Sequence, residues 1–202
     1  MKNIIKNTLI LTTITLVAGV LLGVVYEITK GPIALAKEAA KKEAYQQVMS
    51  EANTFDLLEL VEEAIRTVED REESSGCTIN EVVEAKLDGE TVGYVVTTTT
   101  SEGYGGEIQV SVGILKDGMV NGVAILSISE TAGLGMKAKE EAFYGQYSGK
   151  NVEFFSVTKT GASSDSEIDA LSGATITSNA MTKAVNSAIV YYKHAIGGSA
   201  IE

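Results

Sequence analysis

An uncharged run near the N-terminus constrains this chain most strongly. Asn7 through Tyr26 form 20 consecutive residues without a charged side chain, and most of them are aliphatic. At about 1.5 Å per residue, a helix of this length spans the roughly 30 Å hydrocarbon core of a bilayer. The run therefore predicts a single membrane-spanning helix, within an anchor that we place at residues 1–30.

This N-terminus allows two other interpretations. Lys2 and Lys6 ahead of an apolar run, with Ala34-Leu35-Ala36 behind it, also occur in cleaved signal peptides. That apolar run is longer than the ~7 to 15 apolar residues of a signal peptide. Charged residues and a proline at 27–32 also separate it from the alanines of a cleavage site. Both observations favour a membrane anchor. A pilin-like assembly helix is the other alternative, although the sequence shows no processing signal for it. Lysines flank the run on both sides, so charge does not set its direction.

The chain after this run is strongly acidic. It contains all 27 Asp and Glu residues but only 14 of the 16 basic ones, and the net charge of the protein is -11. Such a field repels phosphate backbones, which argues against nucleic acid as a partner. Cys77 is the single cysteine and His194 the single histidine, so neither an internal disulfide nor a histidine-based metal site is expected. We predict structural roles for both residues and no metal site.

Residues 31–75 are predicted to form a helical linker and packing region. Pro32 suits the first turn of a helix that we expect to end at about residues 50–53. A second helix is predicted over residues 55–73, because apolar side chains recur there at helical spacing. These side chains are Leu57, Leu58, Val61, Ala64, Ile65 and Val68. The two helices are expected to separate the following domain from the membrane and to pack against that domain.

From residue 76 the pattern changes from helix to strand and predicts one α+β domain over residues 76–202. β-Branched residues flank Asp88-Gly89, and the arrangement recurs around Asp117-Gly118. Asp-Gly suits a type I′ turn, in which both central residues take positive φ. Two such hairpins predict an antiparallel sheet of at least four strands, packed by helices.

Two glycine clusters accompany these hairpins, at residues 101–107 and 130–137. Glycine permits positive φ and close backbone approach, so such clusters either make turns or leave room for a ligand. Taken alone, each is more simply a turn, and Tyr104 is then an ordinary turn residue. Further along, residues 139–147 predict a short helix and residues 159–167 a polar loop.

A last helix follows the stretch DALSGATITS, residues 169–178. Its apolar side chains predict a start near Thr177 or Ser178 and an end before Gly197 and Gly198. A helix N-terminus favours an anion, because its amides are free and the helix dipole is positive there.

The hydroxyls of this stretch allow three interpretations. Thr177 or Ser178 caps the helix, Ser172 is a hydrolase nucleophile, or a threonine carries a phosphate ester. The sequence lacks G-x-S-x-G and its one histidine lies a long helix away, which argues against a hydrolase. The residues themselves do not decide between the cap and the ester.

Asp169 through Thr175 match the pattern D-x-x-[ST]-G-A-[TS] at every specified position. This run resembles the flavinylation motif of the FMN-binding domain family. In that family a flavin transferase, which uses FAD and Mg²⁺, joins FMN through its phosphate to the last hydroxyl residue, which here is Thr175. The resemblance further implies a cofactor site that includes Asp169, Ser172, Gly173, Ala174 and Thr177.

The rest of the chain is similar to the G subunit of Rnf electron-transport complexes. The likeness rests on the N-terminal helix, the stretches GYGGEIQVSVGI and ETAGLGMKAKEEAFYGQY, and a motif close to the C-terminus. The C subunit of the sodium-pumping NADH:quinone reductase is the nearest alternative, and a non-redox pilin-like or adhesive module is the alternative from another class. In the family an E-T-P-G-L-G loop lies against the flavin, with alanine here at the usual proline. The resemblance thereby implies contacts from Glu130, Thr131, Gly133, Leu134 and Gly135, and more weakly from Tyr104.

The resemblance also implies a function and a setting. The complex would couple electron flow between ferredoxin and NAD⁺ to ion movement, with this chain as an FMN relay among other membrane subunits. No side chain suggests an acid–base catalyst, so the flavin itself is expected to supply the redox chemistry. The family's flavin domain faces the extracytoplasmic side, which implies a single-pass protein of the cell membrane with its domain outside.

Overall fold

The computed structural model describes residues 1–197, which fall into two compact units, residues 1–41 and the chain from residue 42 on. The first unit is helical, as part of α1 (Lys2–Val48). By length and composition α1 can cross a membrane, and its most apolar 18-residue window has a mean hydropathy of 2.4. Pro32 lies inside this helix, so the prediction of a new helix there was wrong. A proline removes one helical hydrogen bond, and the helix formers around it continue the helix on both sides.

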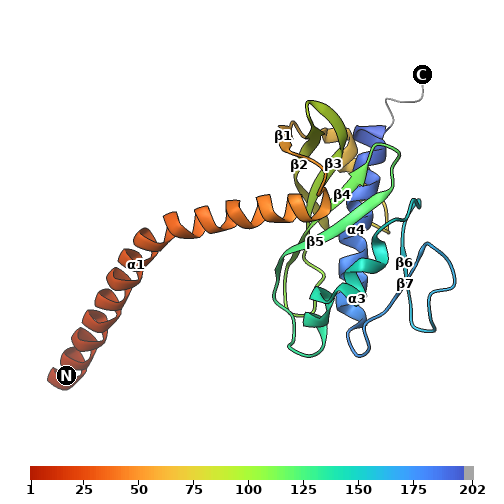
Figure 1. The fold of residues 1–202 in the computed structure, drawn as a ribbon. Coiled ribbons are helices and arrows are strands. Elements are labelled where there is room, and N and C mark those ends of the chain that lie inside the picture. The colour runs from red at the N-terminus through yellow and green to blue at the C-terminus, as the bar shows by residue number, and fades with distance from the viewer. Residues whose placement is uncertain (198–202) are drawn as a thin grey trace. The chain divides into compact units, whose positions relative to one another are not determined.

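The unit from residue 42 on is an α+β domain, which confirms the predicted fold class (Figure 1). Five strands form an antiparallel sheet in the order β1-β2-β3-β4-β5, and β6 and β7 form a separate parallel pair. The elements are β1 (Thr54–Leu58), α2 (Glu62–Asp70), β2 (Cys77–Leu87), β3 (Glu90–Thr100), β4 (Ile108–Leu115), β5 (Val120–Ile128), η1 (Gly135–Lys139), α3 (Glu141–Tyr144), η2 (Gly145–Tyr147), β6 (Ser156–Thr158), β7 (Glu167–Asp169) and α4 (Thr175–Ala195).

Both predicted hairpins are present, but only one has the expected turn. Asp88 and Gly89 have φ of 51° and 89°, as a type I′ turn requires. In the second hairpin Gly118 has φ of 85°, whereas Asp117 is not among the residues of positive φ. Its carboxylate instead accepts the N–H of Met119 at 3.0 Å, which fixes a longer turn. The type I′ prediction was therefore wrong at this hairpin.

The predicted helix over residues 55–73 was also wrong in its first part. Residues 54–58 form β1, which pairs with the edge of β2, and α2 begins only at Glu62. The N–H of Asn53 donates to the carbonyl of Lys86 at 2.8 Å and starts this pairing. An available sheet edge thus overrides the helical spacing, and Leu57 is left 71% exposed. Ala64 and Val68 keep the buried helical face that the pattern predicted.

One face of the sheet packs against α4, which runs beside β2, β3 and β4 (Figure 1). The helix joins the sheet by polar contacts as well, because the buried hydroxyl of Thr98 donates to the carbonyl of Ala184 at 2.9 Å. Asn186, only 2% exposed, accepts the N–H of Phe155 at 2.7 Å and donates to its carbonyl at 2.9 Å. These contacts fix α4, and the segment that precedes β6, to the core. As predicted, α4 ends before Gly197, while Gly198 lies outside the described residues.

The two residues with predicted structural roles lie at element ends. Cys77 is the buried first residue of β2, and burial raises the pKa of its thiol. His194 lies in the last turn of α4, where a basic side chain complements the helix dipole. Both positions suit a structural role.

The opposite face of the sheet is covered in part by the C-terminal turns of α1. Ala44, Tyr45 and Val48 are buried against it. The contact is close at Gly113 of β4, where an added Cβ would lie 2.6 Å from the carbonyl oxygen of Val48. Asn121 also donates a side-chain hydrogen bond to that carbonyl at 2.6 Å. Glycine at position 113 therefore lets the end of α1 approach the sheet.

We expect Gly113→Ala to loosen this contact. The new methyl group would overlap the backbone of Val48, so the domain should lose about 1–3 kcal/mol of stability. The measurement is thermal unfolding of the full chain in detergent. Gly122→Ala on β5 is the matched control, because there the nearest atom lies at an ordinary 3.5 Å. Equal destabilisation by both variants would contradict this account.

Candidate cofactor-binding site

The stretch 169–178 forms a turn that leads into α4. This helix begins at Thr175 after Ala174, and no side chain caps it, so the predicted start and caps at Thr177 or Ser178 were wrong. Ser178 instead forms hydrogen bonds with the preceding turn. Its hydroxyl accepts the N–H of Leu171 at 2.9 Å and donates to the carbonyl of Ala174 at 3.0 Å. The turn, in which Gly173 has φ of 75°, is thereby closed onto the first turn of the helix.

Because α4 begins at Thr175, three amides at its N-terminus remain free of helical hydrogen bonds. The first helical bond runs from the N–H of Ser178 to the carbonyl of Ala174 at 3.0 Å. The amides of Thr175, Ile176 and Thr177 precede it, and together with the dipole of this 21-residue helix they favour a negative charge. The half-buried Thr175 hydroxyl makes no hydrogen bond within the described part of the chain.

A pocket of about 540 Å³ opens at this helix N-terminus. Three segments line it: the loop after β3, the loop after β5 and the start of α4. The lining residues are Tyr104, Glu130, Thr131, Leu134, Gly135, Gly173, Ala174, Thr175, Ile176 and Thr177. The fold thus brings together both glycine clusters and the DALSGATITS stretch, which lie far apart in the sequence.

Glu130 connects two of these segments. Its Oε1 accepts the backbone N–H of Tyr104 at 2.8 Å. Its Oε2 lies 2.7 Å from the position that a Cβ on Gly135 would take, and the Thr177 hydroxyl lies at the same distance from that position. Glycine at 135 therefore keeps open the space between these two polar groups.

Thr177 is the second polar group without a protein partner. The residue is only 1% exposed, it lines the pocket, and its hydroxyl has no hydrogen bond to any of residues 1–197. No buried side-chain oxygen or nitrogen of the described residues lacks a hydrogen-bond partner, so this hydroxyl is reached by solvent from the pocket. It can therefore donate to a polar group of a ligand bound there.

The rim of the pocket is apolar. Tyr104, Leu134 and Ile176 are 70%, 43% and 52% exposed, although each is large and hydrophobic. Ile176 was missed by the sequence analysis. It is an apolar residue that follows Thr175 directly and lies outside the buried stripe of α4. An apolar residue at such a position could have been predicted to contact a ligand. The three side chains provide apolar surface for a flat ligand.

Three of the predicted site residues do not line the pocket: Asp169, Ser172 and Gly133. The carboxylate of Asp169 accepts the N–H of Ala162 at 2.6 Å, and its backbone N–H donates to Gln146 Oε1 at 2.7 Å. Gln146 also donates to the Asp169 carbonyl at 3.3 Å, a contact that sequence reasoning missed because Gln146 lies 23 residues away. Ser172 and Gly133 are exposed.

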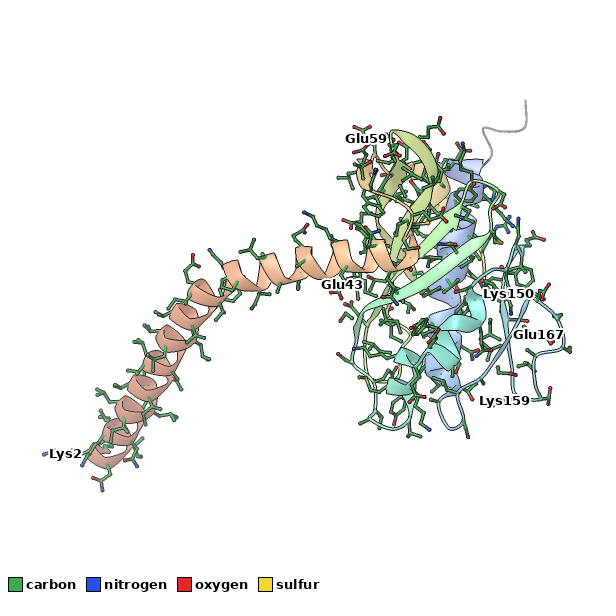
Figure 2. All side chains as sticks on the ribbon, in the orientation of Figure 1. Lys2, Glu43, Glu59, Lys150, Lys159 and Glu167 are labelled. Atoms are coloured by element: carbon green, nitrogen blue, oxygen red, sulfur yellow. The ribbon has the colours of Figure 1, made fainter. Side chains whose placement is uncertain are left out.

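The loop over residues 159–166 is held beside this stretch. Lys150 donates to the carbonyl of Glu167 at 3.4 Å, and Figure 2 shows the two residues on neighbouring segments. The backbone N–H and hydroxyl of Ser163 both donate to the Glu167 carboxylate at 2.7 Å, and these bonds lower its pKa. The polar loop was predicted, whereas the parallel pairing of β6 and β7 at its ends was not.

The residues of the pocket fit a ligand with a flat apolar ring and a phosphate. Its volume is within the roughly 300–1,000 Å³ of small-molecule sites, and its exposed walls are apolar. Free amides and the unpartnered Thr177 hydroxyl offer donors to a phosphate or to a polar ring edge. FMN has these features.

Comparison with known proteins supports this assignment. The model of the "FMN-binding domain" matches residues 103–190, and that of the "RnfG N-terminal region" matches residues 1–48. The fold is similar to that of NqrC from Shewanella oneidensis, with a TM-score of 0.51 and 16% identity over 74% of this chain and 84% of that one.

Relatives align along nearly the whole chain. The G subunit of the Na⁺-translocating ferredoxin:NAD⁺ oxidoreductase complex of Acetobacterium woodii is 35% identical, over 96% of this chain and 93% of its own. The G subunit of the ion-translocating oxidoreductase complex of Methanosarcina acetivorans is 30% identical, over 94% and 95%. These matches decide against the pilin-like and quinone-reductase alternatives. The chain belongs to the RnfG family, the G subunits of Rnf-type ion-translocating oxidoreductase complexes.

Proposed function

We propose that this chain carries FMN on Thr175 through a phosphoester and relays electrons between ferredoxin and NAD⁺ within its membrane complex. One observation carries the proposal: the Thr175 hydroxyl lacks a hydrogen-bond partner among the described residues and lies at a helix N-terminus beside a pocket that fits the cofactor. A flavin accepts one or two electrons, and a covalent tether prevents its loss.

The attachment step follows from the chemistry of the hydroxyl. Thr175 Oγ forms a bond to the phosphorus of the FMN half of FAD, and the pyrophosphate bond of FAD breaks. AMP leaves, and the hydroxyl proton passes to a base or to water. A flavin transferase with Mg²⁺ would supply this step. Asp169 and Ser172 lie outside the pocket, and we propose that the transferase recognises them.

The chain's own groups then hold the cofactor. The amides of Thr175, Ile176 and Thr177 and the positive end of α4 stabilise the phosphate charge. Leu134 and Ile176 would offer apolar surface to the ring system, and the Thr177 hydroxyl would donate to a polar atom of the cofactor. These residues orient the flavin and set its surroundings, while the flavin supplies the redox chemistry.

The experiment that tests the proposal begins with the full chain, co-expressed with a flavin transferase. The purified protein is denatured, separated on a gel and examined for flavin fluorescence. We expect a fluorescent band, and a proteolytic peptide containing Thr175 whose mass is increased by that of an FMN phosphoester. A protein without covalent flavin under these conditions would overturn the proposal.

We further propose that the anchor lies within residues 1–30, in the cell membrane, and that the flavin domain is extracytoplasmic. Cys77 cannot report on this because it is 6% exposed and its thiol pKa is raised by burial. A chain with Cys77→Ala and Lys159→Cys places one thiol on an exposed loop, where Figure 2 marks Lys159. We expect a membrane-impermeant maleimide to label it in intact cells. Labelling only after lysis would place the domain inside, and the Cys77→Ala chain alone controls for background.

A further inference from the structure

We propose that the Glu130 carboxylate sets the reduction potential of the flavin and holds it low. This inference rests on the proposed function, because it concerns the cofactor attached at Thr175. It assigns Glu130 an electrostatic role toward the flavin, in addition to its hydrogen bond with the loop after β3.

The charge distribution of the pocket supports this role. Among its ten lining residues, all of them described, Glu130 is the single charged side chain. The remaining walls are apolar or neutral, so no cation in the lining offsets the carboxylate. Unless a proton accompanies every electron, reduction adds negative charge to the isoalloxazine ring. A nearby carboxylate disfavours that charge and makes the flavin a stronger reductant.

The position of this carboxylate is fixed from two sides. Oε1 is held by the N–H of Tyr104 at 2.8 Å, and it lies 3.0 Å from the Cβ position of Gly103. Oε2 lies against Gly135, 2.7 Å from its Cβ position. The side chain is half-buried, so solvent screens it less than a carboxylate on the open surface. Glycines at 103 and 135 leave the room that this arrangement needs.

The test compares reduction potentials in three variants of the full, flavinylated chain. Glu130→Gln removes the charge but keeps an oxygen that can accept the Tyr104 N–H, so its potential should rise. Thr131→Asp adds a second carboxylate to the lining and should lower the potential. Glu107→Gln is the matched control, because it removes one exposed carboxylate that does not line the pocket. Its potential should stay that of the unmodified chain.

The potentials are measured by spectroelectrochemical titration with dithionite as the reductant. A unit charge beside a partly exposed site changes a charging equilibrium by about tenfold. For a two-electron couple, tenfold corresponds to about 30 mV. We therefore expect Glu130→Gln to shift the ratio of reduced to oxidised flavin by about tenfold toward the reduced form at a fixed potential.

The outcomes separate the inference from the proposed function. An unmodified chain without covalent flavin refutes the function itself. Two outcomes refute only the role of Glu130: the flavin of Glu130→Gln has the reduction potential of the unmodified chain, or Glu107→Gln shifts the potential by as much as Glu130→Gln does. If Glu130→Gln does not accept flavin, Thr131→Asp decides, and an unchanged or raised potential in that variant overturns the inference.

Discussion

Thr175→Ala is expected to abolish covalent flavin completely. The variant lacks the one oxygen to which the phosphorus would bond, and no neighbouring hydroxyl takes its place. Ser178 is engaged with Leu171 and Ala174, Thr177 is buried to 1% exposure, and the exposed Ser172 does not line the pocket. The measurement is flavin fluorescence on a denaturing gel, normalised to protein, after co-expression with the transferase. The fold should persist, because Thr175 is half-buried at the edge of the domain and makes no side-chain hydrogen bond to the described residues.

Two further variants make this result specific. Thr175→Ser keeps a hydroxyl at the same place and should retain covalent flavin. Thr67→Ala removes a threonine hydroxyl from the exposed surface of α2, where it bonds to the carbonyl of Glu63 at 2.9 Å, and should change nothing. Covalent flavin on the Thr175→Ala chain would show that the cofactor is attached elsewhere. Its loss from Thr67→Ala would point to a general defect in maturation.

Local chemistry accounts for the features that could be predicted from the sequence. The uncharged run, the Asp-Gly turn at residues 88–89 and the run 169–175 that resembles a flavinylation motif each depend on residues that lie next to one another in the chain. The resemblance to a family added the loop over residues 130–135, which the fold then placed in the same pocket as Thr175. Tyr104 shows the limit of local reasoning, since a turn residue and a pocket residue look alike until the neighbouring loop is known.

Long-range contacts account for what could not be predicted. Residues 54–58 have helical spacing, but β2 offers them a free edge, and strand pairing prevails. The start of α4 lies two to three residues earlier than expected because Ser178 closes the turn from inside the helix rather than capping its end. Gln146 supports Asp169 from another element, and nothing in the sequence near either residue indicates that pairing. The reactive residues of the site are therefore neighbours in the sequence, whereas the residues that hold them in place are distant in the sequence.

Gly135→Ala should release the flavin from the pocket without removing it from the protein. The new Cβ would lie 2.7 Å from both Glu130 Oε2 and Thr177 Oγ1, and 2.8 Å from Glu130 Cβ. These contacts are too short, so the loop or both side chains must move, at a cost of about 1–3 kcal/mol. Attachment at Thr175 does not depend on that space. We therefore expect a flavinylated chain whose flavin shows lower fluorescence anisotropy and stronger quenching by iodide.

Gly145→Ala is the matched control for this prediction. An added Cβ there meets its nearest atom, Glu141 Cγ, at an ordinary 3.6 Å, and the backbone has φ of -66°, which alanine adopts readily. Its flavin should behave as in the unmodified chain. If the flavin of Gly135→Ala stays as immobile and as protected as that of Gly145→Ala, its binding does not depend on the arrangement of Glu130 and Thr177 around Gly135. The predicted role of this space in holding the ring would then be wrong, while the attachment site remained.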